Sequence, residues 1–197
     1  MKLIGMLDSP FVRRVAVTLA ARGIPFEHES ISVFREMERF GAVNPLFKSP
    51  SLIADDGTIL MESSVILHWI EGISGVSLLP DDKAARTRVA RRVALGLVAA
   101  EKAVQIEYER KRPEHERTAS WQERIAGQVA AAWGAIENEL AEDLDPLALD
   151  GITIVAAWGF GRFVTPDHAP PERFPKLSAF AVDAEALPPY KRFPVDG

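Results

Sequence analysis

The chain is poor in residues on which enzyme chemistry often depends. Its 197 residues include no cysteine and only four histidines, which are scattered and form neither an HExxH motif nor an i, i+4 pair. Without cysteine there is no disulfide, no cysteine-ligated zinc or iron–sulfur centre and no thiol nucleophile in the chain itself. The sequence therefore predicts no metal site, and catalysis by a cysteine side chain is excluded.

The chain also lacks an excess of positive charge and a long apolar run. It has 23 basic and 28 acidic residues, a formal net charge of -5, so no broad basic surface is available to bind a phosphate backbone. The longest apolar run, residues 93–100, is far shorter than the roughly 18 residues that span a bilayer, and the first residues lack the pattern of a signal peptide. We expect no nucleic-acid partner, no membrane span and a cytoplasmic location.

What is present is an ordinary globular composition, 47% hydrophobic and 26% charged, with alternating strand and helix signals at the start. Ser9 is a good helix N-cap and Pro10 suits the first helical position, directly after the apolar residues 2–7. The pair Asp56-Gly57 between two apolar runs is a strong hairpin signal. Residues 1–76 therefore predict a βαβ unit followed by a ββα unit, that is, a small mixed sheet covered by helices.

Strand signals stop after residue 76, and long helical patterns follow. The predicted helices run from Asp81 or Asp82 to about Arg112, from 118 to 144, from 152 to 164 and from 175 to 186, with a proline-rich tail. We therefore expect an α/β domain at 1–76, a linker at 77–82 and an all-helical domain at 83–197.

The helix predicted from residue 152 is apolar nearly all round, as in a buried central helix. Thr153 stands where a capping box would begin, but Ala156 replaces the acid that would return the hydrogen bond. Thr153 is the expected cap of this helix, and Asp150, one turn earlier, is the alternative.

Three polar positions in the first 76 residues could bind an anionic ligand. Ser9 lies between the first strand and the first helix, where its hydroxyl and the free NH groups of the helix point to the same place. Ser49-Pro50 precedes the hairpin, and Glu62-Ser63 opens the next helix with a carboxylate and a hydroxyl. A structural explanation exists for each of these, namely a helix cap, a turn proline and a second helix cap.

The order of these segments resembles the cytosolic glutathione S-transferase family, in its serine-type, bacterial-like form. The matching segments are residues 9–14 (SPFVRR), 44–52 (NPLFKSPSL) and 62–64 (ESS), and the FPKL of residues 174–177 is similar to the start of the family's last helix. The resemblance implies a thioredoxin-like domain followed by an all-α domain. It also implies a homodimer, for which we expect an interface of residues 62–71 with the basic residues 86–92.

The resemblance implies a role for Ser9 in catalysis. Ser9 would donate a hydrogen bond to the sulfur of glutathione, and Arg13, one helical turn later, would orient the site or strengthen its positive field. A free thiol has a pKa near 8.5, so a hydroxyl donor and a helix N-terminus favour the thiolate at pH 7. The sulfur belongs to the ligand, so the missing cysteines are no obstacle.

The resemblance also implies which residues hold glutathione. Ser49 would pair its backbone with the cysteinyl part, and the bond to Pro50 would be cis. Glu62 and Ser63 would hold the γ-glutamyl end, and Lys48 is the candidate for the glycine carboxylate. Glutathione would be a co-substrate, with no metal.

The sequence departs from the family pattern at Phe47, where glycine is common, at Ser49, where a small apolar residue is commoner, and at Ala156.

Two functions stay open: an enzyme of detoxification that joins the glutathione thiolate to an electrophilic apolar small molecule, and a non-catalytic glutathione-binding or protein-interaction module of the same fold. A glutathione-dependent disulfide reductase would need a cysteine in place of Ser9.

The second substrate would bind beside Ser9 and the helical half. Its pocket would lie near the Tyr108 end of the long helix and near Trp158 or Phe163, although these rings are also reasonable core residues.

Overall fold

The computed structural model describes residues 1–140 and 144–196 and divides the chain into two compact units. One unit comprises Met1–Leu78 together with Leu187–Gly197, and the other comprises Leu79–Ala186. The sequence predicts that the C-terminal segment belongs to the helical part, whereas the structure groups it with the N-terminal unit.

A four-stranded mixed sheet forms the centre of the N-terminal unit. Its strands are β1 (Lys2–Ile4), β2 (Glu27–Glu29), β3 (Ser51–Ile53) and β4 (Ile59–Met61), in the order β2-β1-β3-β4. Strands β1 and β2 are parallel, and the other two pairs are antiparallel. Gly57, with φ 86°, takes the left-handed conformation that the turn between β3 and β4 requires. The predicted βαβ and ββα units, and the hairpin at Asp56-Gly57, are confirmed.

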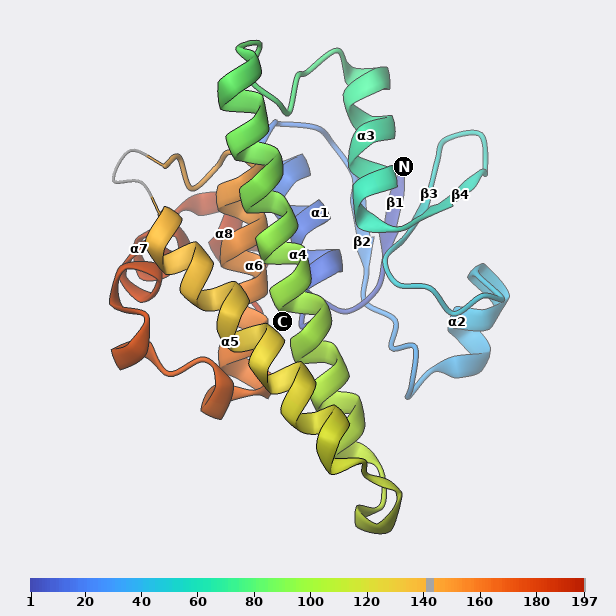
Figure 1. Cartoon of the computed structure of the whole chain (residues 1–197). Helices are drawn as coiled ribbons and strands as arrows, with labels where there is room; N and C mark the ends of the chain where they lie inside the picture. Colours follow the sequence, from blue (N-terminus) through green and yellow to red (C-terminus); the bar gives the residue numbers. More distant parts are fainter. Residues whose placement is uncertain (141–143, 197) are drawn as a thin grey trace. The chain divides into compact units, whose positions relative to one another are not determined.

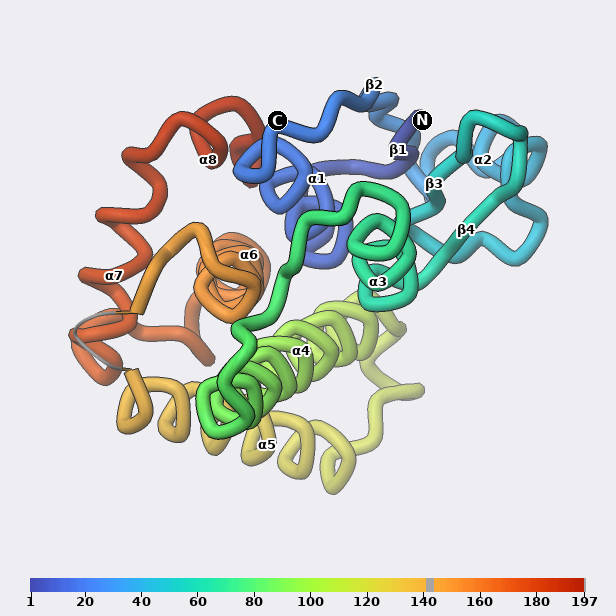
Figure 2. The backbone as a smooth tube through the Cα atoms, turned by 90° about the horizontal axis from the view of Figure 1, so that it is seen from above, coloured from blue at the N-terminus to red at the C-terminus, as the bar shows by residue number. Residues whose placement is uncertain are grey.

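Three helices cover this sheet: α1 (Pro10–Ala21), α2 (Met37–Val43) and α3 (Ser63–Ser74). Helices α1 and α3 contact each other, and Figure 2 shows them on one side of the sheet with α2 on the other. On the α2 side, Ile4, Ile31 and Phe40 form one buried cluster. Because side chains alternate along a strand, Leu3, also fully buried, faces α1 and α3. This is the thioredoxin-like arrangement that the resemblance implied.

The C-terminal segment packs against α1 through a short helix, α8 (Pro188–Arg192). The Nε of Arg13 donates a 2.8 Å hydrogen bond to the carbonyl of Phe193, and its guanidinium carbon lies 5.7 Å from the ring centre of Tyr190. The ring of Phe193 stacks on Phe26 with centroids 5.4 Å apart. These contacts are the reason why the predicted tail belongs to the N-terminal unit.

The second unit is all-helical in the part of the chain that the structure describes. Its elements are α4 (Lys83–Lys111), η1 (Glu114–Glu116), α5 (Ala119–Glu139), α6 (Leu149–Val164), η2 (Pro166–His168), η3 (Pro171–Arg173) and α7 (Pro175–Glu185). Figure 1 shows α4 running beside α5, and α4 also packs along α6. The predicted stripe of α5 is buried at Ile125, Val129, Trp133 and Ile136. Residues 141–143 of the predicted helix lie outside the described residues.

The expected start of α6 at Thr153 is wrong. The N-cap is Ala148, five residues before Thr153, so the alternative cap Asp150 is wrong as well, and the Thr153 hydroxyl donates a 2.6 Å hydrogen bond back to the carbonyl of Leu149. Asp150, in the first turn, pairs with Nε of Arg92 on α4 at 2.6 Å. This buried pair, together with the close packing of α4 on α6, extends the helix beyond the point where the capping pattern alone would start it.

Candidate functional site

Ser9 lies at the junction of β1 and α1 and caps the helix. Its hydroxyl oxygen accepts a long hydrogen bond of 3.4 Å from the backbone NH of Val12, and Pro10 occupies the first helical position. The oxygen is the acceptor, so the hydroxyl hydrogen is left to donate to another group. Ser9 is partly exposed. The arrangement therefore combines a helix cap with a donor that lies at the positive end of α1.

Gly5 brings the loop before β3 close to the start of α1. A Cβ on Gly5 would lie 2.5 Å from the Oγ of Ser49 and 2.7 Å from a methyl carbon of Val12, and its φ of 136° is unfavourable for other residues. Glycine is thus required for this approach, which brings the predicted residue Ser49 beside the first turn that Ser9 caps.

The loop that carries Lys48, Ser49 and Pro50 is held by two buried polar residues that sequence reasoning did not select. The amide of Asn44 donates to the hydroxyl of Ser51 at 2.9 Å, and that hydroxyl donates to the carbonyl of Lys48 at 2.8 Å. The bond between Ser49 and Pro50 is cis, as predicted, and Pro50 is buried. An asparagine directly before a proline was the available signal for Asn44, because such pairs commonly start turns.

Phe47, one of the departures from the family pattern, has the backbone conformation that explains why glycine is common there. Its φ is 52°, in the left-handed region. Its ring packs over Gly41, where a Cβ would lie 2.9 Å from the ring, and stacks on Phe40 at 6.4 Å. The packing of the Phe47 ring, which a glycine could not provide, offsets the strain of its left-handed backbone conformation.

Lys48 and Glu62 form an ion pair at the surface. The Nζ of Lys48 lies 3.4 Å from a carboxylate oxygen of Glu62, and the side chains are 54% and 46% exposed. Glu62 caps α3 with a φ of 72°, and its carboxylate accepts a 3.5 Å hydrogen bond from the NH of Ser64. Ser63, by contrast, is fully buried. Of the residues predicted for the γ-glutamyl end, only Glu62 is open to solvent.

The two consecutive arginines of α1 are both buried and serve different parts of the unit. Arg13 is fully buried against Tyr190 and Phe193, so its guanidinium does not reach the surface. Arg14, which sequence reasoning missed, donates 3.0 Å hydrogen bonds to the hydroxyls of Ser63 and Ser64. Burial lowers the pKa of Arg14 to about 10, although the negative charge of Glu62 opposes this shift.

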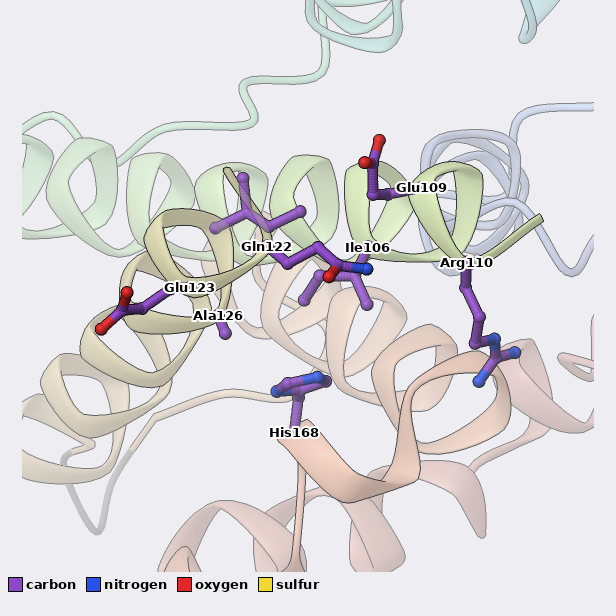
Figure 3. Close-up of a pocket in the computed structure, with 8 residues that line it drawn as sticks. Ile106, Glu109, Arg110, Gln122, Glu123, Ala126 and His168 are labelled. Atoms are coloured by element: carbon purple, nitrogen blue, oxygen red, sulfur yellow. The ribbon is translucent and has the colours of Figure 1, made fainter. Parts of the chain in front are cut away.

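The helical unit contains a cavity of about 350 Å³, within the range of small-molecule pockets. Figure 3 shows His168, carried by η2, facing Gln122 of α5 and Ile106 of α4. The lining residues, all in the helical unit, are Ile106, Glu109, Arg110, Gln122, Glu123, Ile125, Ala126 and His168.

The aromatic residues considered for a second substrate divide into core and surface. Trp158 is 4% exposed and packs edge-on against Trp133 and Phe174, so it belongs to the core. Tyr108 and Phe163 are 50% and 54% exposed.

Among the described residues, no group of three or more histidine or acidic side chains is placed to hold a metal ion. None of the described helices is long and apolar enough to cross a bilayer.

Comparison with known proteins gives matches over the N-terminal unit. The family model "Glutathione S-transferase, N-terminal domain" matches residues 3–77. Glutathione S-transferase U4 of Arabidopsis thaliana is 34% identical over 82 residues, which are 41% of this chain and 37% of that protein. The GST-like protein YibF of Escherichia coli K12 is 33% identical over 96 residues, 48% of each. The matched part thus spans less than half the length of these curated relatives.

Solved structures match over nearly the whole chain. A glutathione S-transferase of Methylobacterium radiotolerans, in complex with glutathione sulfonate, has a TM-score of 0.89 and 27% identity over 98% of this chain and 93% of that one. A glutathione transferase family member of Pseudomonas fluorescens Pf-5, with bound glutathione, has a TM-score of 0.85 and 26% identity over 98% and 97%. Residues 3–77 thus match the N-terminal domain of the glutathione S-transferase family, and the chain, with its thioredoxin-like sheet and helical remainder, has the fold of these glutathione transferases.

Proposed function

We propose that this chain is a glutathione transferase that joins the thiolate of glutathione to an electrophilic, apolar small molecule. The observation that carries the proposal is the position of Ser9, a partly exposed hydroxyl at the N-terminus of a 12-residue helix. Since its oxygen accepts from Val12, its hydrogen is available for a sulfur anion. The glutathione bound in similar solved structures supports the identity of the ligand.

The proposed reaction uses the positive end of α1 and the Ser9 hydroxyl to favour the thiolate. A free thiol is only a few per cent ionised at pH 7, and both groups stabilise the anion more than the neutral thiol. The sulfur lone pair then attacks an electrophilic carbon of the second substrate. A leaving group departs with the bonding electrons, or, when the substrate is an activated double bond, the electrons move to its far end and are protonated there.

The proposed binding residues lie at the ends of the elements around Ser9. Lys48 would hold the glycine carboxylate, the backbone at Ser49, before Pro50, would pair with the cysteinyl part, and Glu62 would hold the α-amino group of the γ-glutamyl end. The Lys48–Glu62 ion pair is half-exposed and worth at most about 1 kcal/mol, so the opposite charges of a ligand can replace it.

Ser63 and Arg13 would support the glutathione site without touching the ligand through their side chains, because both side chains are fully buried. Ser63 would support the γ-glutamyl end from the first turn of α3. Arg13 would support the site by holding the C-terminal segment against α1, through its hydrogen bond to Phe193.

We further propose that the chain acts as a homodimer in the cytoplasm, with a role in detoxification. Two arginines expected at the interface have partners in their own chain, because Arg91 pairs with Glu139 and Arg92 with Asp150. The face of α3, with Val65 and Ile73 about half exposed, is then the main part of the proposed interface. Sedimentation would test it, and a concentration-independent monomer mass would refute the dimer.

The second candidate is a glutathione-binding module without turnover, and the hydrogen bond from Val12 to Ser9 favours it, since capping alone explains the serine. Steady-state conjugation with aryl halides, enones and epoxides, together with calorimetric glutathione binding, separates the two. Turnover supports the transferase, binding without turnover supports the module, and no binding overturns both.

A further inference from the structure

The cavity of the helical unit lies where α4, α5 and η2 meet. Its volume of about 350 Å³ is at the lower end of the range for small-molecule pockets, which suits a molecule of about two rings. Ile106 of α4, together with Ile125 and Ala126 of α5, gives it apolar walls. Among the described residues that line it, none is proposed above for glutathione or considered for the second substrate. The cavity is therefore a candidate site of its own.

Two carboxylates line this cavity. Glu109 of α4 is only 8% exposed, and its Oε1 accepts a 2.9 Å hydrogen bond from the NH of Thr118, the N-cap residue of α5. Because a carboxylate accepts through both oxygens, Oε2 of Glu109 is left as an acceptor. The second carboxylate, that of Glu123 on α5, is exposed. Capping of α5 thus accounts for one oxygen of Glu109 and leaves the other for a ligand.

The cations nearest in the sequence are engaged elsewhere. Arg110, whose guanidinium also lines the cavity, pairs with Glu107, and Lys111 pairs with the same carboxylate. Arg117 donates to the backbone carbonyls of residues 110 and 112. Within the part of the chain that the structure describes, neither carboxylate of the cavity has an ion pair. A ligand that brings its own positive charge would complement them.

The remaining polar wall consists of Gln122 and His168, which face each other (Figure 3). Neither side chain makes a hydrogen bond to another described residue. The amide oxygen of Gln122 and one nitrogen of a neutral imidazole are acceptors, whereas an ammonium group has three donors and no acceptor. An anion would instead meet two carboxylates, with the one lining guanidinium already paired. Donor count and charge therefore both favour an amine.

We propose that this cavity binds an amphipathic amine, that is, a protonated amino group attached to an apolar body of about two rings. The rings would lie against Ile106, Ile125 and Ala126, and the ammonium would donate to Glu109, with Glu123 adding to the negative field. The site shares no residue with the proposed glutathione site, so the inference does not depend on the proposed function.

The test uses three naphthalene probes that differ in charge: naphthylmethylamine, which is a cation at pH 7, the neutral naphthylmethanol, and the anion naphthoate. Dissociation constants are measured by calorimetry on the whole chain. We expect the amine to bind most tightly and naphthoate most weakly. Equal affinity for the amine and the alcohol, or no binding of the amine, would overturn the inference.

Charge-removing variants test the two carboxylates. Glu109→Gln keeps the shape of the side chain and an acceptor for Thr118, and it should weaken the amine roughly tenfold or more, because a hydrogen bond to a charged group is lost. Binding of naphthylmethanol should change little. Glu123→Gln, at an exposed position, should weaken the amine by no more than about fivefold. Glu172→Gln is the matched control, since this exposed carboxylate on η3 does not line the cavity, and it should leave all three probes unchanged.

Ala126→Phe tests the place of binding, because the larger side chain fills the cavity and should abolish binding of the amine. Unchanged affinity in Ala126→Phe or in Glu109→Gln would refute the site. Melting curves show whether each variant is folded, and if one of these two is not, the other decides. Saturating glutathione and Ser9→Ala should both leave the affinity for the amine unchanged. A loss with either would place the amine at the glutathione site and overturn the inference.

Discussion

Ser9→Ala separates the two roles that the structure allows for this serine. As a cap, Ser9 accepts a hydrogen bond of 3.4 Å from the NH of Val12, which is long. Its removal should therefore lower the free energy of unfolding by about 0.5 to 1 kcal/mol, the low end of the range for helix caps. As a thiolate donor, it contributes a charge-assisted hydrogen bond of about 1.5 to 3 kcal/mol. The second effect is the larger one, and it appears on the ligand rather than on stability.

The expected size of that effect follows from the energy of the bond. Since 1.36 kcal/mol corresponds to one pH unit, losing the donor should raise the pKa of the bound thiol by roughly 1 to 2. At pH values below both pKa values the thiolate fraction, and with it kcat/KM, should fall about 10- to 100-fold, and the loss should disappear as the pH rises above the raised pKa. Ultraviolet absorbance of the thiolate, titrated in the complex, measures the pKa directly.

Ser9→Asp is the matched variant. Aspartate is as good an N-cap as serine and suits the positive end of α1, so stability should be kept. Its charge repels the thiolate, however, so the pKa of the bound thiol should rise at least as much as in Ser9→Ala. An unchanged titration midpoint in both variants, with normal turnover, would leave Ser9 as a helix cap only.

Three further predictions concern stability. Arg92→Met leaves the carboxylate of Asp150, which is 1% exposed, without its partner, so the free energy of unfolding in urea should fall by about 3 to 5 kcal/mol. Adding Asp150→Leu should recover most of this loss. A small loss in Arg92→Met alone would contradict the importance of the pair. Ala156→Asp places an unpaired charge in the middle of buried α6 and should cost more than about 3 kcal/mol, whereas a gain would mean that Thr153 caps the helix after all. The NH of Ser32 and the guanidinium of Arg39 hold the pKa of the Glu36 carboxyl below its usual 4.5. The stability that this carboxylate adds is therefore present above pH 4.5 and is lost as the pH falls through the lowered pKa. The melting temperature of Glu36→Gln should fall less in acid than that of the unmodified chain, and equal falls would refute the role of Glu36.

Features of the fold that depend on neighbouring residues could be predicted from the sequence alone. Ser9-Pro10 starts α1 because a cap and a first-turn proline act within four residues. Asp56-Gly57 makes the hairpin because a turn needs only two residues with the right backbone freedom. The stripe through Trp133 and Ile136 predicted a buried helix face because the helical period fixes which side chains share a side.

Contacts between residues that are far apart in the sequence could not be predicted, because they depend on how the elements pack. Arg14 and Ser63 are 49 residues apart, and Arg13 and Phe193 are 180 apart, so no local pattern reveals either hydrogen bond. The same holds for the start of α6, where Asp150 meets Arg92 across 58 residues and overrides the local capping pattern. Caps and turns are governed by the geometry of a few consecutive residues, whereas the burial of a charge depends on which elements pack around it, and that is fixed only when the chain has folded.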